Sequence, residues 1–286
     1  DVQAVLSRIT SDDFNVDKVE KKERRRNAPL PYTTSSLQQD AANKINFRTR
    51  KTMMVAQQLY EGINLGFRSS RFDYLYAYGL CPSGQCCRCG NSQLYRRGLW
   101  RCYLPKKPNV YSSRKNAQEA HEAIRPTSVM RTPDEVAPYL ERDQLRLYRL
   151  IWERTVSCKW HPASVRSQPS SLTAGPYELR ASGSVVKFDG FLTLMDKKEL
   201  AGEKTKKVPH LKEGTPLTLI SVDDAIQHFT EPPAYFTEAT LVKELEEKGI
   251  GRPSTYATII QTILSRGYVA KEAKKSHADG IGHDDH

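Results

Sequence analysis

The sequence predicts an α+β protein built from more than one domain. Apolar residues recur at helical spacing in the first third of the chain, alternate with polar residues over 176–222, and return to helical spacing from Thr237 onward. A strand-rich part therefore separates two helical parts, which favours discontinuous domains. The length of 286 residues suffices for one large domain or two smaller ones.

The N-terminal third should hold helices on both sides of an irregular segment. A strand-like segment over 1–33 precedes two helices, which the apolar spacing places at about 36–46 and 50–61. Helical spacing disappears over 67–102, where Arg, Cys, Gly and Tyr residues crowd together, and it returns over 115–124.

The next helix has a strong start signal. Thr132 can cap a helix, Pro133 suits the first helical position, and Glu135 can complete a capping box. Pro138 should break or kink this helix early. Helical spacing then continues to about residue 156.

Alternating residues predict strands in the following segment. Tyr177 and Leu179 alternate with polar residues, and Leu192 and Leu194 do so around Thr193. Asp189-Gly190 marks a turn between strands. A last strand is expected over 217–222.

Two helices should follow the strands. The first extends from Thr237 through Glu247, and Gly249 and Gly251 should end it. The second is expected from about 254 to 266, with Gly267 as its cap.

The composition favours a polyanionic partner. Lys and Arg number 44 against 33 Asp and Glu, which gives a net charge of +11, and the mean hydropathy is −0.62. The run Lys21–Arg26 is most simply a solvated face, with a phosphate-facing role as the alternative. No run of about 18 apolar residues and no signal peptide occur, so we expect no contact with a membrane. Because no Met begins the chain, we expect it to start inside a longer protein.

Three stretches, in the same order along the chain, carry recognisable motifs. They are Thr33–Gln39 with Lys51–Met54 and Gln57–Glu61, then Gln118–Thr127, and finally Phe236–Ala257. Together they resemble the bacterial type IA DNA topoisomerases, and the resemblance extends over most of the chain.

The resemblance implies an enzyme that cleaves one DNA strand with a tyrosine nucleophile, passes the other strand and reseals the break. Such an enzyme relaxes negative supercoils with Mg²⁺ and without ATP, because a phosphotyrosine conserves the energy of the broken bond. The implied partner is single-stranded or negatively supercoiled DNA, the implied location is the bacterial cytoplasm at the nucleoid, and a monomer is expected. A Toprim domain preceding this stretch would bind Mg²⁺, so we assign no metal ligand and no cofactor to this chain.

The resemblance also implies a toroid-like architecture, with a helical domain inserted in a β-rich domain. Residues 1–33 and 168–225 would form the β-rich arch, residues 34–167 the helical domain, and residues 226–286 the start of a DNA-gripping domain.

The tyrosine motif of the family, Gly-Leu-Ile-Thr-Tyr-Met-Arg-Thr-Asp-Ser, is missing from its expected place. Arg71–Leu80 stands there instead. Back-translation as CGG TTT GAT TAC CTA TAT GCG TAC GGA CTC, followed by the T of Cys81 and read one base later, gives the motif in full. The nucleophile codon then straddles Leu75 and Tyr76, so no residue of this chain is assigned as catalytic.

Similar shifts recover family-like sequence near 157–168 and over 276–286. We therefore hypothesise compensating frameshifts over 67–102 and 157–168, and a terminal shift after about 275. The shifts would be either real changes in the gene or errors in its determined sequence. We expect the altered segment 67–102 to pack poorly, because it lacks an amphipathic period.

The resemblance assigns DNA contacts to two groups of residues. On a helix, Gln118, His121, Glu122 and Arg125 would share one face, and the matching His of the family contacts the DNA backbone. A solvated helical face is the alternative.

The second group opens the last helix. Arg252, the hydroxyls of Ser254 and Thr255, and free N–H groups at a helix start can cradle a phosphate. In the family, the matching Arg and Thr hold single-stranded DNA near the scissile phosphate. Ordinary N-capping by Ser254 is the alternative, and both can hold together. Lys243 is expected to form a surface ion pair.

Two other functions stay open. One is a non-catalytic module that binds single-stranded DNA. The other is an interaction domain stabilised by zinc, although only Cys86 and Cys89 have C-x-x-C spacing and paired knuckles are lacking. The candidate zinc ligands are Cys81, Cys86, Cys87, Cys89 and Cys102.

Overall fold

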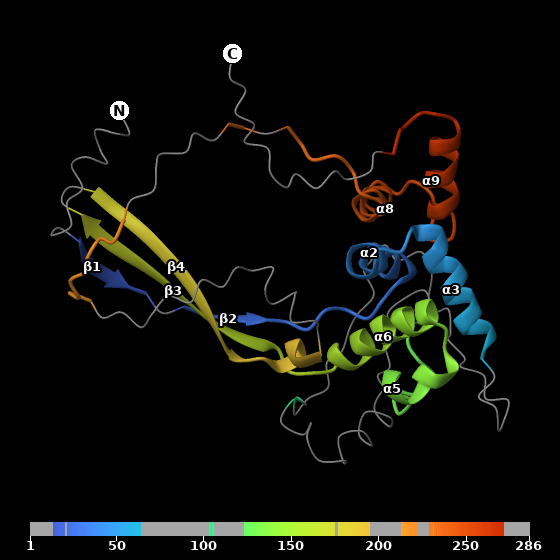
Figure 1. The fold of residues 1–286 in the computed structure, drawn as a ribbon, viewed down its shortest axis with the longest axis horizontal. Helices are drawn as coiled ribbons and strands as arrows, with labels where there is room; N and C mark the ends of the chain where they lie inside the picture. The colour runs from blue at the N-terminus through green and yellow to red at the C-terminus, as the bar shows by residue number, and fades with distance from the viewer. Residues whose placement is uncertain are drawn as a thin grey trace, which may run out of the picture. The chain divides into compact units, whose positions relative to one another are not determined.

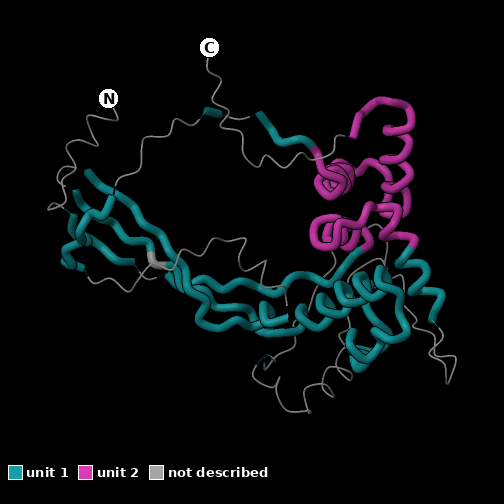
Figure 2. Tube along the Cα trace, in the orientation of Figure 1, with its two compact units in different colours: residues 1–33, 55–235 teal, residues 34–54, 236–286 magenta. Residues whose placement is uncertain are grey.

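The computed structural model describes most of the chain and divides it into two compact units. The described residues are 14–20, 22–63, 103, 105, 123–174, 177–194, 213–221, 229–230 and 232–271. Unit 1 comprises residues 1–33 and 55–235, and unit 2 comprises residues 34–54 and 236–286 (Figure 2). The assignment of an arch, a helical domain and a DNA-gripping domain stays a prediction.

A four-stranded antiparallel sheet forms one part of unit 1 (Figure 1). Its central strand β3 pairs with β4 along almost its whole length, so β1 and β2 share the other edge of β3. β1 lies along the C-terminal half of β3 and β2 along the N-terminal half. The strands are β1 (Phe14–Val19), β2 (Lys22–Arg26), β3 (Ala163–Ala174) and β4 (Tyr177–Phe188).

Three helical elements directly precede strand β3 in sequence. The capping box predicted at Thr132 is confirmed, since its side chain accepts from the Glu135 N–H and the Glu135 side chain accepts from the Thr132 N–H. Pro138 lies in a 3-10 turn that separates α5 from α6, which confirms the predicted break. The elements are α5 (Pro133–Val136), η3 (Ala137–Tyr139) and α6 (Arg142–Ser157).

Two predicted strands are wrong. Leu192 and Leu194 lie in the 3-10 turn η4 (Gly190–Leu194), where Phe191 and Leu192 are buried. Residues 217–221 form no strand, although the N–H of Leu217 donates to the carbonyl of Phe14 in β1 at 2.9 Å. At Gly190–Leu194, adjacent apolar residues are buried together in one turn, so the alternation expected of a strand does not occur.

The core of unit 1 includes part of the segment for which we hypothesise a frameshift. Trp160 is fully buried, and its ring stacks on Tyr103 with centroids 4.9 Å apart. Cys158 is also buried, and its Sγ donates to the carbonyl of Thr155 at 3.1 Å. A Cβ on Gly190, which has φ +51°, would come within 2.5 Å of the His161 carbonyl oxygen. Cys158 and Trp160, which lie in the segment 157–168, therefore pack closely in the core of unit 1.

Unit 2 is helical, and the boundary with unit 1 falls inside α3. Its helices are α2 (Thr34–Ile45), the first part of α3 (Thr49–Glu61), α8 (Glu238–Glu247) and α9 (Tyr256–Ser265). The four helices predicted at about 36–46, 50–61, 237–247 and 254–266 are therefore confirmed, with ends displaced by about two residues. Val242, Leu245, Tyr256 and Ile260 form the buried core between α8 and α9.

Glycines end α8 and α9 as the sequence predicts. After α8, the N–H of Ile250 donates to Leu245 and the N–H of Gly249 to Glu246, with Gly249 at φ +68°. This pair of bonds is a Schellman motif. Tyr268 and Gly267 repeat it after α9. In the described ranges, no helix combines the length and the apolar character needed to span a bilayer.

Candidate nucleic-acid interface

The first and third family-like motifs meet in unit 2. The hydroxyl of Ser35 in α2 donates to Glu246 Oε1 in α8 at 2.7 Å, and Gln39 Nε2 donates to the other oxygen at 3.4 Å. Gln38 Nε2 donates to the carbonyl of Pro253 at 3.2 Å. Residues more than 200 positions apart in sequence therefore fix α2 against α8 and against the loop before α9.

Besides the bond from Gln38, the loop Gly251–Thr255 is held by its own backbone and by the hydroxyl of Thr255. Thr255 Oγ1 accepts from the N–H of Arg252 at 2.9 Å and donates to the carbonyl of Arg252 at 3.0 Å. Gly251 has φ +76°, and a Cβ there would lie 2.5 Å from Ile259 Cδ1. The left-handed backbone favours glycine at this position. Contacts within the chain therefore define the shape of the loop.

The three predicted side chains of the loop are all exposed. Among the described residues, the Arg252 side chain makes one hydrogen bond, a long one from Nη1 to the Gly251 carbonyl at 3.4 Å. Ser254 has no hydrogen-bond partner among the described residues, and the N-cap of α9 is Thr255, so N-capping by Ser254 is wrong. Thr255 uses its hydroxyl to shape the loop. Arg252 and Ser254 are thus the groups presented to solvent at the start of α9.

Two other ionisable groups of unit 2, Tyr256 and Lys243, are buried or paired. Burial raises the pKa of the Tyr256 phenol, and the nearby Glu246 carboxylate raises it further. Tyr256 is therefore protonated at neutral pH and packs as a core residue. Lys243 lies 3.8 Å from Glu247, which confirms the predicted surface pair. Arg252 is consequently the exposed cation of this loop that no carboxylate holds among the described residues.

The other predicted group is described only at its end. Gln118, His121 and Glu122 lie outside the described residues. Ile124 forms a β-bridge with Tyr32, with its N–H 2.8 Å from the Tyr32 carbonyl, and Arg125 follows it in extended backbone. The predicted helix therefore does not continue to Arg125, because pairing with Tyr32 fixes this segment instead. Arg125 belongs to unit 1 and Arg252 to unit 2.

Sequence reasoning missed the residues that support the loop. Ser35, Gln38 and Glu246 lie within the quoted motifs, but their role depends on contacts between distant segments. The signal that could have found them is their polar character on the inner side of amphipathic helices, where Ser35 and Gln38 are buried.

The described residues do not form a metal site. In these ranges, no three His, Cys, Asp or Glu residues are grouped so that they could hold a metal ion. Cys158 is a buried thiol that forms no disulfide among the described residues, and the other five cysteines lie outside these residues. We therefore derive no step through Mg²⁺ from these residues.

Comparisons with known proteins identify the family. A family model described as DNA topoisomerase matches residues 1–81 and 85–284. The structure of full-length topoisomerase I from Thermotoga maritima is similar to this one, with a TM-score of 0.78 and 31% sequence identity. The match covers 95% of this chain and 44% of that chain, so the present chain spans less than half the length of that protein. The chain thus belongs to the bacterial type IA DNA topoisomerases, which are isomerases.

Proposed function

We propose that this chain is the part of a type IA topoisomerase that grips single-stranded DNA at Arg252, and that it does not relax DNA by itself. The complete enzyme would cleave one strand through a phosphotyrosine, pass the other strand and reseal the break. The observation that carries the proposal is the exposed Arg252 on a preformed loop at the start of α9, inside the motif that matches the family.

The chemistry of the loop suits a phosphate diester. A guanidinium group can donate two parallel hydrogen bonds to phosphate oxygens. The Ser254 hydroxyl is exposed beside it, and the positive end of the α9 dipole favours an anion at the same place. Because Thr255 already holds the loop, binding would order few additional side chains.

The lack of relaxation is proposed from the sequence. The tyrosine motif of the family does not occur in the amino-acid sequence. Arg71–Leu80 occupies the position where the motif is expected, and this segment lies outside the described residues. Mg²⁺, which the family uses in catalysis, would supply charge stabilisation at the cleaved phosphate in the complete enzyme. We propose that its ligands lie in a Toprim domain rather than in this chain.

Binding to a fluorescent dT20 strand tests the proposed grip. Replacing Arg252 with Ala should weaken binding on the order of tenfold at low salt, because one charge-assisted phosphate contact is lost. Lys248→Ala is the matched control, since Lys248 is exposed in the same unit but pairs with Glu244 at 3.1 Å. Equal losses in both variants would contradict the proposal. Measurable relaxation of supercoiled plasmid by the purified chain with Mg²⁺ would overturn its second part.

Two further variants and one sequencing experiment separate the alternatives. A reduction of salt-sensitive binding by both Arg252→Ala and His121→Ala, with no cleavage, would support a non-catalytic module. One equivalent of bound zinc would instead support the zinc-stabilised domain. Sequencing the encoding DNA over codons 60–110 tests the frameshift hypothesis. One extra base near codon 67 and one missing base near codon 102 would restore the tyrosine motif.

The family also supports a proposal about the setting of the protein. We propose a monomer at the bacterial nucleoid in the cytoplasm, with single-stranded or negatively supercoiled DNA as its partner. Size-exclusion chromatography with light scattering checks the monomer.

A further inference from the structure

Strand β2 is the most basic element of the described sheet. It spans Lys22–Arg26, with the sequence Lys-Glu-Arg-Arg-Arg, and all five residues are exposed. Within the described sheet, β2 pairs with β3 alone. The proposed single-strand grip lies in unit 2 and does not use this strand.

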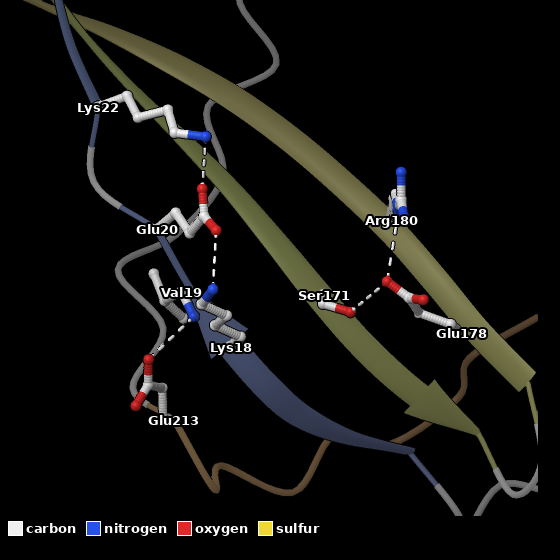
Figure 3. Close-up of polar contacts among 8 residues, drawn as sticks. All are labelled: Lys18, Val19, Glu20, Lys22, Ser171, Glu178, Arg180 and Glu213. Carbon is white, nitrogen blue, oxygen red and sulfur yellow. Dashed lines mark hydrogen bonds and ion pairs between the residues drawn. The ribbon is translucent and has the colours of Figure 1, made fainter.

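Glu20, the carboxylate that precedes β2 in sequence, is already engaged by two lysines. Its oxygens lie 2.5 Å from Lys22 Nζ and 2.9 Å from Lys18 Nζ (Figure 3). Hydrogen bonds from Lys22 and Lys18 lower the pKa of Glu20 to about 2. Glu20 is therefore fully charged at neutral pH, and its negative charge is balanced by lysines rather than by the arginines of β2.

The carboxylate within β2 is engaged too. Glu23 Oε1 accepts from Arg166 Nη2 at 3.2 Å and from Lys187 Nζ. Side chains alternate along a strand, so Glu23 and Arg25 lie on the face opposite Lys22, Arg24 and Arg26. Glu23 is consequently directed away from Arg24 and Arg26.

Three arginines of β2 have no ion pair within the part of the chain that the structure describes. Among the described residues, Arg24, Arg25 and Arg26 contact no carboxylate, whereas Arg180 on the same sheet lies 3.3 Å from Glu178 (Figure 3). Arg24 and Arg26 lie two residues apart on one face, about 6.8 Å apart along the strand. With Lys22 they form a line of three cations about 14 Å long, which we call the arginine row.

We propose that the arginine row, Lys22, Arg24 and Arg26, binds the phosphate backbone of duplex DNA. A line of exposed cations matches the regularly spaced charges of a DNA strand. The direct partners of these residues on β3 are Ala163, Val165 and Ser167. None of them is aromatic, whereas surfaces that bind single strands combine cations with aromatic rings on which bases stack. The composition of this face therefore favours a duplex over a single strand.

The test compares two variants that remove the same charge from the same sheet. Arg24→Gln/Arg26→Gln removes the unpaired cations, and Lys18→Gln/Arg180→Gln removes two exposed cations that hold carboxylates. Each variant of the whole 286-residue chain is titrated with a fluorescent 20-base-pair duplex and with dT20, at several salt concentrations. Arg24→Lys/Arg26→Lys keeps the charge and should retain most of the binding.

We expect Arg24→Gln/Arg26→Gln to lose roughly tenfold or more in duplex affinity, and its salt dependence to flatten by about 1.8 in log–log slope, which corresponds to two phosphate contacts. The affinity for dT20 should fall by less than about threefold in the same variant. Equal losses in the two double variants would overturn the proposal and favour charges that merely protect a sheet edge. A loss confined to dT20, or no duplex binding by the unaltered chain at low salt, would also overturn it. The proposed grip at Arg252 fails or stands separately, because it is measured with Arg252→Ala.

Discussion

Acidic side chains act differently in the two units. In unit 2, Glu246 and Glu238 accept hydrogen bonds from side chains or backbone N–H groups of helices far away in sequence. On the sheet of unit 1, Glu20 and Glu178 hold neighbouring cations at the exposed surface (Figure 3). Hydrogen bonds from Lys22 and Lys18 lower the pKa of Glu20 to about 2, yet ion pairs at the surface contribute little to stability. The comparison teaches that the groups a carboxylate connects matter more than the size of its pKa shift.

Glu246→Ala should give the largest effect on this comparison. The substitution removes the acceptor of the buried Ser35 hydroxyl and of Gln39, so we expect a loss of about 2 kcal/mol in the free energy of unfolding. Hydrogen exchange of α2 and α8 amides measures it. Glu246→Gln keeps an oxygen acceptor and should lose less. Unchanged exchange in Glu246→Ala would show that the two helices do not depend on this contact.

Glu238→Gln should have a smaller effect that depends on pH. Burial raises the pKa of Glu238, but hydrogen bonds from Lys271 and from the Thr49 N–H lower it more, so the net pKa lies below 4.5. The charged form then stabilises unit 2 above about pH 4.5, and this contribution disappears as the pH falls through the folded-state pKa.

At neutral pH the variant should lose about 1 kcal/mol, because α3 loses a charged cap at its first N–H. Denaturant unfolding at pH 7 and at pH 3 measures both terms, and the difference between parent and variant should shrink at pH 3. A constant difference would contradict the assignment of the effect to the carboxylate charge.

Glu20→Gln should have the smallest effect. The unfolding midpoint of the variant should match that of the parent, although nuclear magnetic resonance should find Glu20 titrating near pH 2 in the parent. A loss as large as that of Glu246→Ala would break the comparison between the two units.

Local signals in the sequence predicted the helices and their ends. The capping box at Thr132 and the glycine stops at Gly249 and Gly267 depend on a few adjacent residues, and the structure confirms each. Strand β3 was not predicted, because Ser-Gln-Pro-Ser-Ser near its centre has little preference for strands. Pairing on both edges, with β4 on one side and β1 and β2 on the other, stabilises it instead.

In the candidate site too, features that depend on neighbouring residues were predicted, and features that depend on distant segments were not. The exposed loop around Arg252 was predicted because its glycine, proline and hydroxyl residues are neighbours in sequence. The support from Gln38 and Ser35 was not, since it requires segments more than 200 residues apart to meet. The ion pairs of Glu23 could not be predicted from the sequence either, because Arg166 and Lys187 reach Glu23 only through strand pairing.

The arrangement around β3 also sets an order for folding. β4 follows β3 after two residues, so these strands can form a hairpin locally, whereas β1 and β2 must wait for a partner made far later (Figure 1). During synthesis at about 5–20 residues per second, the N-terminal strands stay without their partner for on the order of ten seconds. During that interval the strong positive charge of β2 protects the unpaired strand from aggregation, because like charges on other nascent chains repel it.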